Sequence, residues 1–276
     1  MQIIDAHCHF WRLARGDYGW LAGEGGPLAP IRRDFLPGDY PAEAPRLIAV
    51  QAAPTVAETE FLLALAAEEP RIAGVVGWVD LTDPGAVETL QRLAADQKFK
   101  GIRPMLQDIA DTDWLLTAPL PAVPVAVTSL GLRFDALVTQ RHLPNLLRFV
   151  ERHPDQPVVI DHAAKPQPEG RAGWEAGLRR LGENTNAFCK LSGLLTEFSL
   201  KMLARPADEL RAILSRLLDW FGPERLIWGS DWPVLTLAAD YDRWRALTAE
   251  ALRDLSPAEQ AAIMSGNAAR FYGVTS

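Results

Sequence analysis

The chain has 276 residues, of which 48% are hydrophobic, and 35 acidic against 28 basic residues give it a net charge of −7. This composition predicts a globular protein with a large core, and the negative balance argues against binding to nucleic acids or anionic membranes. Two cysteines provide no disulfide framework, and no run of about 18 apolar residues predicts a membrane span. The opening residues also lack the basic and apolar stretches of a signal peptide, so we expect a cytoplasmic protein.

The first predicted strand, residues 3–9, ends in two histidines, His7 and His9. Because side chains alternate along a strand, both should share one face with Asp5, while Ala6 should lie on the other face. Two neighbouring imidazoles can bind a metal ion or polarise a carbonyl. An isolated pair at the end of a strand is more often only solvated, so the rest of the chain must decide between these interpretations.

A long segment without clear periodicity follows this strand. Residues 10–45 are rich in glycine, proline and aromatic side chains. Loops of this length within a compact domain are commonly lids or binding loops, although aromatic residues can also simply pin such a loop to the surface. We expect an insertion after the first strand, and not a second domain.

From residue 47 onward, short apolar strands alternate with helical patterns. Further strands are predicted at residues 47–51, 72–80, 99–103, 132–138, 157–162, 187–191 and 226–231. Helices are predicted near residues 55–69, 83–94, 114–130, 140–153, 174–181, 208–221, 241–252 and 257–271. Two of the helices begin with a capping box, at Thr55 with Glu58 and at Ser256 with Glu259.

The alternation of eight strands with helices predicts the α/β fold class. Its expected form is a single (β/α)8 TIM-barrel domain that spans residues 1–276. A doubly wound open sheet is the competing architecture. It usually carries a glycine-rich loop after the first strand, where this chain has His7 and His9.

Polar residues stand at the predicted strand ends, which is where TIM barrels carry their catalytic side chains. These residues are His7, His9, Gln51, Asp80, Arg103, Asp135, Asp161, His162, Lys190 and Asp231. Gln51 and Asp80 are expected to cap turns or helices. Lys190 and Arg103 need a carboxylate or a ligand, since an unpaired buried cation is costly. For Asp135, the backbone or a neighbouring histidine is the expected partner.

Because strand ends meet around one axis, His7, His9, His162 and Asp231 should converge. Three imidazoles and one carboxylate can bind a single Zn²⁺. They can equally form a metal-free site, in which Asp231 takes a proton from water while the histidines and Arg103 bind the developing oxyanion. Either site predicts hydrolysis at a polarised carbonyl, or a lyase step that uses the same Lewis acid. No Gly-x-Ser-x-Gly nucleophile elbow occurs.

Motifs spread over nearly the whole chain resemble a known family. They are IDAHCHFW at 4–11, RDFLP at 33–37, GWVDL at 77–81, KGIRP at 100–104, DHAAKP at 161–166, CKLSG at 189–193, GSDWP at 229–233 and NAxRFYG at 267–273. Together they resemble the sugar-lactonase branch of the amidohydrolase superfamily, which includes L-fuconolactonase and L-rhamnonolactonase and is related to 2-pyrone-4,6-dicarboxylate lactonase. The resemblance implies a distorted (β/α)8 barrel that hydrolyses a small lactone to its hydroxy acid.

The same resemblance implies roles for individual residues. Asp231 would be the base that activates water, and Arg103 would help to hold the carbonyl or the substrate. His7, His9 and His162 would surround the carbonyl or, with Asp231, bind a metal ion. The further candidates for substrate contact are Trp78, Lys165 and Trp232.

This chain departs from the binuclear members of the superfamily, which carry a bridging lysine on strand four and a histidine on strand five. Those strand ends have Arg103 and Asp135 here, so a bridged two-metal site is not expected. One Zn²⁺ is the expected metal, its need for activity is left open, and no organic cofactor is expected. The expected partner is a small-molecule lactone. A metal-dependent decarboxylase and a non-catalytic binding protein are the alternatives, and the residues do not set the oligomeric state.

Overall fold

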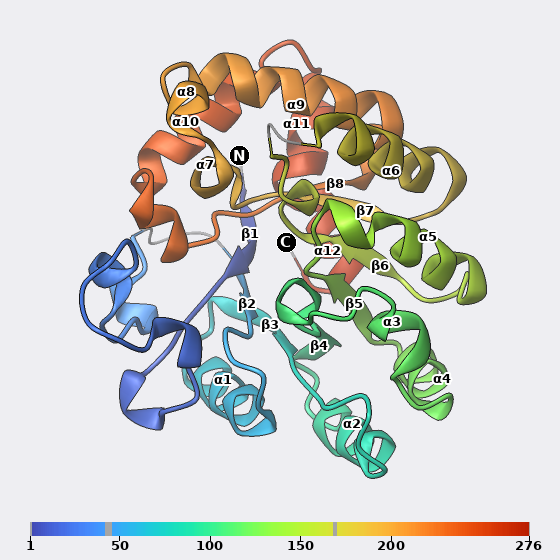
Figure 1. Cartoon of the computed structure of the whole chain (residues 1–276). Coiled ribbons are helices and arrows are strands. Elements are labelled where there is room, and N and C mark those ends of the chain that lie inside the picture. Colours follow the sequence, from blue (N-terminus) through green and yellow to red (C-terminus); the bar gives the residue numbers. More distant parts are fainter. Residues whose placement is uncertain (1, 42–45, 168–169, 276) are drawn as a thin grey trace.

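The computed structural model describes residues 2–41, 46–167 and 170–275 of the chain, and in them eight parallel strands form one sheet in the order β1 to β8 (Figure 1). The strands are β1 Ile4–Cys8, β2 Arg46–Val50, β3 Ile72–Gly77, β4 Phe99–Ile102, β5 Arg133–Ala136, β6 Val158–Ile160, β7 Phe188–Leu191 and β8 Leu226–Trp228. The sheet closes where Asp231 N donates to the carbonyl of His7 and His9 N donates to that of Trp232, both at 2.7 Å. The predicted (β/α)8 barrel is therefore confirmed.

The helices surround the strands and cover the outside of the barrel (Figure 1). They are α1 Val56–Glu68, α2 Ala86–Ala94, α3 Trp114–Thr117, α4 Ala122–Ser129, α5 Leu143–Arg152, α6 Arg171–Asn184, α7 Leu194–Glu197, α8 Leu200–Leu203, α9 Pro206–Phe221, α10 Tyr241–Leu252, α11 Pro257–Ala261 and α12 Asn267–Tyr272. The predicted helix at 114–130 is divided into α3 and α4, and a π-turn at Ala262–Gly266 interrupts the predicted helix at 257–271. The short helices α7 and α8 were not predicted.

The two predicted capping boxes differ in the structure. At the start of α1, Thr55 Oγ1 accepts a hydrogen bond from Glu58 N at 3.1 Å, as predicted. The Glu58 carboxylate does not return to Thr55; it accepts hydrogen bonds from Ala52 N and Ala53 N at 2.9 and 3.0 Å. It therefore holds the loop after β2, and only the box that opens α11 is complete.

Buried apolar side chains fill the inside of the barrel below the strand ends. Ile48 of β2 and Val159 of β6 belong to one cluster, which strands on opposite sides can share only through the barrel interior. Phe271 and Tyr272 of α12 join this cluster, so the last helix closes the end of the barrel that is opposite the carboxyl ends of the strands. A second, larger cluster packs the outer face of the strands against the helices.

A bulge in β1 sets the direction of the first histidine. Between Asp5 and Cys8, three steps along β1 oppose two steps along β2. As a result Ala6 and His7 both face the barrel interior, whereas Asp5 turns outward and accepts a hydrogen bond from Tyr40 Oη at 2.6 Å. The simple alternation that placed Asp5 on the face of His7 and Ala6 on the other face is therefore wrong. Bulges beside active sites commonly redirect one side chain in this way.

The segment after β1 is ordered by its aromatic side chains. It forms four short 3-10 turns, and Trp11 Nε1 donates to the carbonyl of Arg33 at 2.7 Å. Trp20 Nε1 donates to the carbonyl of Ala52 at 2.8 Å, which ties this insertion to the loop after β2. Residues 42–45 of the predicted loop lie outside the described residues.

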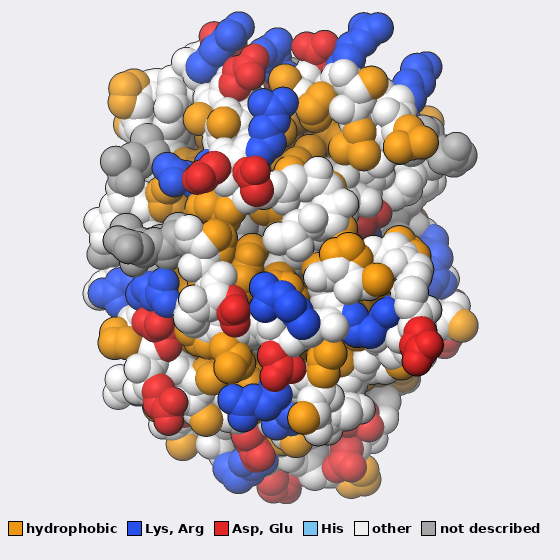
Figure 2. Space-filling view, turned by 90° about the vertical axis from the view of Figure 1, so that its left-hand side faces the viewer, with side chains coloured by type: hydrophobic (Ala, Val, Ile, Leu, Met, Phe, Trp, Pro, Cys, Tyr) orange, Lys and Arg blue, Asp and Glu red, His pale blue; other side chains and the backbone are white. Residues whose placement is uncertain are grey.

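The surface offers no sign of a membrane span. In the described ranges, no helix is long and apolar enough to cross a bilayer. Figure 2 shows one face of the molecule, where basic and acidic side chains are interspersed among hydrophobic ones. The expected lack of nucleic-acid and membrane partners and the cytoplasmic location stay predictions.

Candidate active site

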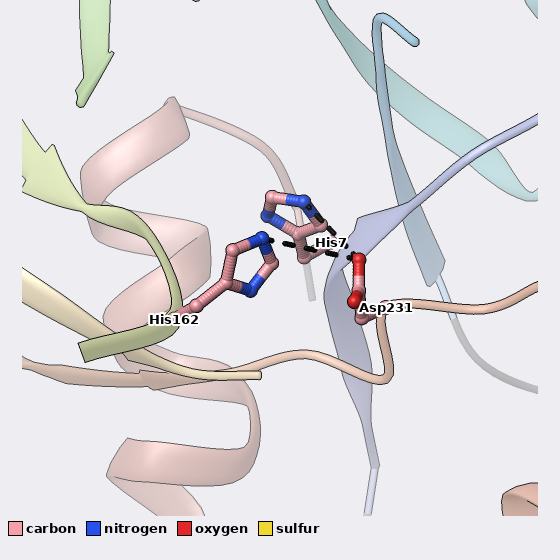
Figure 3. A group of neighbouring side chains, drawn as sticks. All are labelled: His7, His162 and Asp231. Carbon is pink, nitrogen blue, oxygen red and sulfur yellow. Dashed lines mark ion pairs between the residues drawn. The ribbon is translucent and has the colours of Figure 1, made fainter. Parts of the chain in front are cut away.

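Polar side chains from separate parts of the barrel surround the carboxylate of Asp231. The Oδ1 atom of Asp231 lies 3.2 Å from His9 Nε2, 3.7 Å from His7 Nε2 and 4.0 Å from His162 Nε2. Figure 3 shows the imidazoles of His7, from β1, and His162, after β6, turned toward Asp231, after β8. All four residues are buried. The structure thus brings together the histidines and the aspartate that the sequence placed at strand ends.

The backbone around Asp231 is held in an uncommon conformation. Asp231 has a φ of 63°, in the left-handed region that residues other than glycine rarely adopt. Its neighbour Ser230 donates from the backbone N–H to Asp5 Oδ1 at 2.8 Å, and Tyr40 holds the second oxygen of the same carboxylate. Asp5 therefore anchors the segment that carries Asp231. No motif or spacing in the sequence predicts this role.

The turn after β6 that carries His162 is left-handed as well. Four successive residues, His162–Lys165, have φ angles between 47° and 54°. Backbone in this region costs free energy, and a run of it is held only where surrounding contacts fix it. Here Trp174 Nε1 donates to the carbonyl of Ala163 at 2.6 Å, and the hydroxyl of Ser192 lies 3.0 Å from His162 Nδ1.

Gly193 makes room for the side chains of His162 and Asp231. A methyl group at this position would lie 2.4 Å from His162 Nδ1 and 2.9 Å from Asp231 Oδ2. Gly193 also has a φ of 61°, which favours glycine. The CKLSG motif included Gly193, but only the structure shows that it lies against the site.

Arg103 enters the site from the end of β4. Its Nη1 atom lies 3.4 Å from His7 Nε2 and 3.5 Å from Asp161 Oδ2, and its Nη2 atom donates to the backbone carbonyl of Gln51. Gln51 Nε2 donates in return to the carbonyl of Arg103 at 2.7 Å, so Gln51 fixes this arginine and caps no turn. The Nε atom of Arg103 is buried and has no hydrogen-bond partner in the described residues.

A buried ionic group lies directly behind His7. Lys190 Nζ is 2.5 Å from Asp135 Oδ2, 3.1 Å from Asp161 Oδ1 and 3.1 Å from His7 Nδ1. Tyr272 Oη donates to the same oxygen, Asp135 Oδ2, at 2.7 Å. Lys190 therefore has the carboxylate partners that its burial required. Asp135 is paired with a lysine and a tyrosine, and the expected backbone or histidine partner is not found.

The environment sets the charge of the groups around the cavity. Burial lowers the pKa of His7 well below its ordinary value, and the positive charge of Lys190 lowers it further. Burial also lowers the pKa of His162. Both imidazoles are therefore neutral near pH 7, and each has one unprotonated nitrogen. Burial alone would raise the pKa of Asp231, but the nearby His162 and His9 outweigh it and hold that pKa below its usual range.

Three of these residues fit a metal ion. One ligand atom each from His7, His162 and Asp231 lies within 4.8 Å of the others, and no other group of this kind occurs in the described part of the chain. Two neutral imidazoles and a carboxylate are a typical ligand set for catalytic Zn²⁺. The sequence also predicts His9 as a metal ligand. In the structure His9 contacts Asp231 but lies outside this group.

Two cavities open at the strand ends. The polar cavity has a volume of about 210 Å³ and is lined by His9, Arg103, His162 and Asp231 among others. A second cavity of about 490 Å³ lies beside it, and Trp20 lines both. We call the second one the tryptophan cavity, and its walls come from the segments after β1, β2, β3 and β4.

The three remaining candidates for substrate contact occupy different places. Lys165 lines the polar cavity and pairs with Glu197 at 3.0 Å. Trp78 lines the tryptophan cavity and is absent from the residues that line the polar cavity. Trp232 is buried, its ring packs against aromatic side chains that include Phe35, and it lines neither cavity.

The arrangement has counterparts in known proteins. A family model described as Amidohydrolase matches residues 4–274. A protein named L-fucono-1,5-lactonase from Burkholderia ambifaria is 43% identical over 285 residues, covering 98% of this chain and 95% of that protein. One of the same name from Burkholderia multivorans is 40% identical, over 98% of this chain and 96% of that protein. A crystal structure of an amidohydrolase from Burkholderia multivorans with bound zinc superimposes with a TM-score of 0.87 at 37% identity, over 100% of both chains.

Proposed function

The chain belongs to the amidohydrolase family, and we propose that it hydrolyses a sugar-derived 1,5-lactone to its hydroxy acid, with L-fucono-1,5-lactone as the first candidate. The two lactonases that are 43% and 40% identical support the substrate class. The chemistry rests on one observation, which is the convergence of three histidines on Oδ1 of Asp231 within 4.0 Å. Under this proposal the enzyme works in carbohydrate metabolism.

Asp231 is the base in the proposed reaction. Its low pKa keeps it ionised at neutral pH, and it lines the polar cavity where a water molecule and the lactone can meet. Asp231 takes one proton from water as the water oxygen bonds to the lactone carbonyl carbon. The ring C–O bond then breaks, and the same proton passes to the ring oxygen, which leaves as a hydroxyl group.

Arg103 stabilises the negative charge that develops on the carbonyl oxygen. A guanidinium is a charged, multiple hydrogen-bond donor, and Arg103 lines the polar cavity together with Asp231. Such a preorganised donor can contribute a few kcal/mol of transition-state stabilisation, of the order of that measured for oxyanion holes. Gln51 keeps the arginine in place through its bonds to both the backbone and the side chain.

His7, His162 and Asp231 would hold a Zn²⁺ ion, and the zinc-bound relative at 37% identity supports that choice of metal. Bound there, the ion would supply a Lewis acid for the lactone carbonyl. Arg103 Nη1 already lies 3.4 Å from His7 Nε2 and places a positive charge at the same point. We therefore expect a part of the activity to persist without the metal.

Acid release from a panel of lactones, followed at neutral pH with and without a chelator, tests this function. The panel contains L-fucono-1,5-lactone, other aldono-1,5-lactones, their 1,4-lactone isomers and an aromatic lactone. We expect the fastest turnover with a sugar 1,5-lactone and measurable turnover after chelation. No hydrolysis above the spontaneous rate would overturn the proposal. Release of CO2 from an aromatic acid that stops completely on chelation would favour the decarboxylase alternative.

A further inference from the structure

The tryptophan cavity is larger than the proposed reaction requires. A single lactone ring needs only the polar cavity of about 210 Å³, whereas the tryptophan cavity adds about 490 Å³. Small-molecule sites usually occupy about 300–1,000 Å³, and the polar cavity alone falls below that range. The two cavities together fall within it, which suggests a substrate that extends beyond one ring.

The two cavities are adjacent and share part of their lining. Trp20 and Met105 line both of them, and Pro104, which lines the tryptophan cavity, directly follows Arg103 in the polar cavity. A lactone whose carbonyl faces Asp231 can therefore carry a substituent that passes this wall and enters the tryptophan cavity. The segments involved follow β1 to β4, on the side of the barrel away from β6 and β7.

The lining of the tryptophan cavity offers stacking faces and acidic acceptors. Trp20, Trp78 and Trp114 contribute aromatic rings, and aliphatic side chains fill most of the remaining wall. The ionisable lining residues in the described part of the chain are all acidic: Asp17, Asp80 and Asp108. Such a wall repels an anionic substituent and favours a neutral group with an apolar face and hydroxyl donors at its edge.

Asp17 places a buried carboxylate in the wall of the tryptophan cavity. Its side chain is only 8% exposed, and Oδ2 accepts hydrogen bonds from Arg15 and Thr55, both at 2.8 Å. The other oxygen, Oδ1, is buried and has no hydrogen-bond partner in the described residues. Because Oδ1 has almost no accessible surface, Asp17 contributes negative charge to the wall, and the partly exposed Asp80 and the exposed Asp108 provide the acceptors for ligand hydroxyl groups.

We propose that the tryptophan cavity is a second sugar subsite, and that the preferred substrate is an aldono-1,5-lactone that carries a neutral glycosyl substituent. The inference rests on the proposed lactonase function and deepens it. The apolar face of the second ring stacks on the tryptophans, and its hydroxyl groups meet the acidic side chains. Binding energy from this remote ring is available to the transition state and raises kcat/KM.

A pair of substrates tests the proposal directly. One is a simple aldono-1,5-lactone, and the other is the same lactone with a neutral glycosyl group, obtained by oxidising a disaccharide at its reducing end. We expect kcat/KM to be at least about tenfold higher for the glycosylated lactone, as several aromatic contacts together would give. A version with a uronic acid as the second sugar should lose this advantage.

Two variants make the test specific to the cavity. Trp114→Ala removes one stacking face, and Ile109→Trp fills the space. Each should lower the ratio of kcat/KM between the glycosylated and the simple lactone by about fivefold, the value of one aromatic contact. Trp220→Ala is the matched control, because it removes a half-buried tryptophan of α9 that lines neither cavity. This control should leave the ratio unchanged.

The outcomes separate the two proposals. If the simple lactone is hydrolysed but the glycosyl group gives no gain, or if Trp114→Ala and Ile109→Trp leave the ratio unchanged, the second subsite is wrong and the lactonase function stands. An aryl-substituted lactone that outperforms the glycosylated one would overturn the assignment of a sugar. If no lactone is hydrolysed, the proposed function falls and the subsite falls with it.

Discussion

The two sides of the barrel mouth are built on different principles. The side over β1 and β5 to β8 buries an interlocked set of charged groups, in which Lys190, Asp135 and Asp161 support the histidines from behind. The side over β2, β3 and β4 instead surrounds an open cavity with tryptophans and aliphatic side chains. Hydrogen-bonded polar networks fix one geometry, whereas an open apolar wall tolerates change. The polar side is therefore suited to carry the reaction, and the apolar side to choose among substrates.

Among the substitutions considered, Lys190→Met should have the largest effect on the stability and activity of the polar side. Lys190→Met leaves Asp135 as a buried carboxylate without its cation and Asp161 with Arg103 alone, which should lower the free energy of unfolding by about 3–5 kcal/mol. Hydrolysis of simple and glycosylated lactones should fall together. Denaturant unfolding and acid release measure the two effects.

Lys100 supplies the matched control for that change. It lies on β4, away from Lys190 of β7, and is half-buried, with its Nζ 3.4 Å from the carbonyl of Gly273. Lys100→Met should cost no more than about 1 kcal/mol. Equal losses from the two substitutions would contradict a special role for the lysine behind His7.

Adding one methyl group at Gly193 should disturb the reaction with less damage to the fold. The new Cβ of Gly193→Ala would press on His162 and Asp231, and a displacement of about 1 Å in an active site can cost 100-fold. We expect kcat to fall about 100-fold for both kinds of lactone. Gly38→Ala is the control, because a Cβ there meets nothing within 4 Å. Near-normal kcat in Gly193→Ala would contradict the geometry of the site.

The loop between the two sides responds to pH through Glu58. Burial raises the pKa of Glu58 from 4.5 to about 7. The folded protein therefore holds a proton that the unfolded chain has lost, so the free energy of unfolding should fall between pH 4.5 and 7 and level off above it. The fall should be of the order of 3 kcal/mol. Glu58→Gln cannot titrate, and its melting temperature should lose this part of the pH dependence. Identical pH profiles for the two proteins would rule Glu58 out.

Lys165 should have the smallest effect. It lies at the edge of the polar cavity, partly exposed, and its partner is Glu197. Lys165→Ala should raise KM by about threefold and leave kcat within about twofold, as expected for one exposed ion pair. The exposed Lys201 of α8 is a suitable control. A large loss of kcat in Lys165→Ala would instead indicate that Lys165 takes part in the reaction.

The barrel and its central residues could be predicted because they depend on local patterns. Short apolar strands alternate with helices, and parallel strands bring their carboxyl ends to one side of the sheet, so His162 and Asp231 had to approach each other. Lys190 could be assigned carboxylate partners because a buried ammonium requires them. The partners of Asp135 could not be predicted, because they come from β7 and α12, far along the chain.

Other features depend on pairing and packing that the sequence does not reveal. The bulge that turns His7 inward arises from the register between β1 and β2, which alternation alone cannot detect. Glu58 bonds the loop after β2 because that loop passes close to the start of α1. The tryptophan cavity is formed by four segments that follow different strands, so no single motif indicates it. Trp78, a predicted substrate contact, is one of its lining residues.

The central claim is that Asp231 activates water against a lactone carbonyl, and one comparison tests it most directly. Initial rates of acid release from L-fucono-1,5-lactone are measured for the wild-type protein and for Asp231→Asn, with the spontaneous rate subtracted and folding checked by thermal unfolding. Loss of a general base predicts a fall in kcat/KM of about 1,000-fold in a protein that still folds. A folded Asp231→Asn protein within tenfold of the wild-type rate would contradict the account.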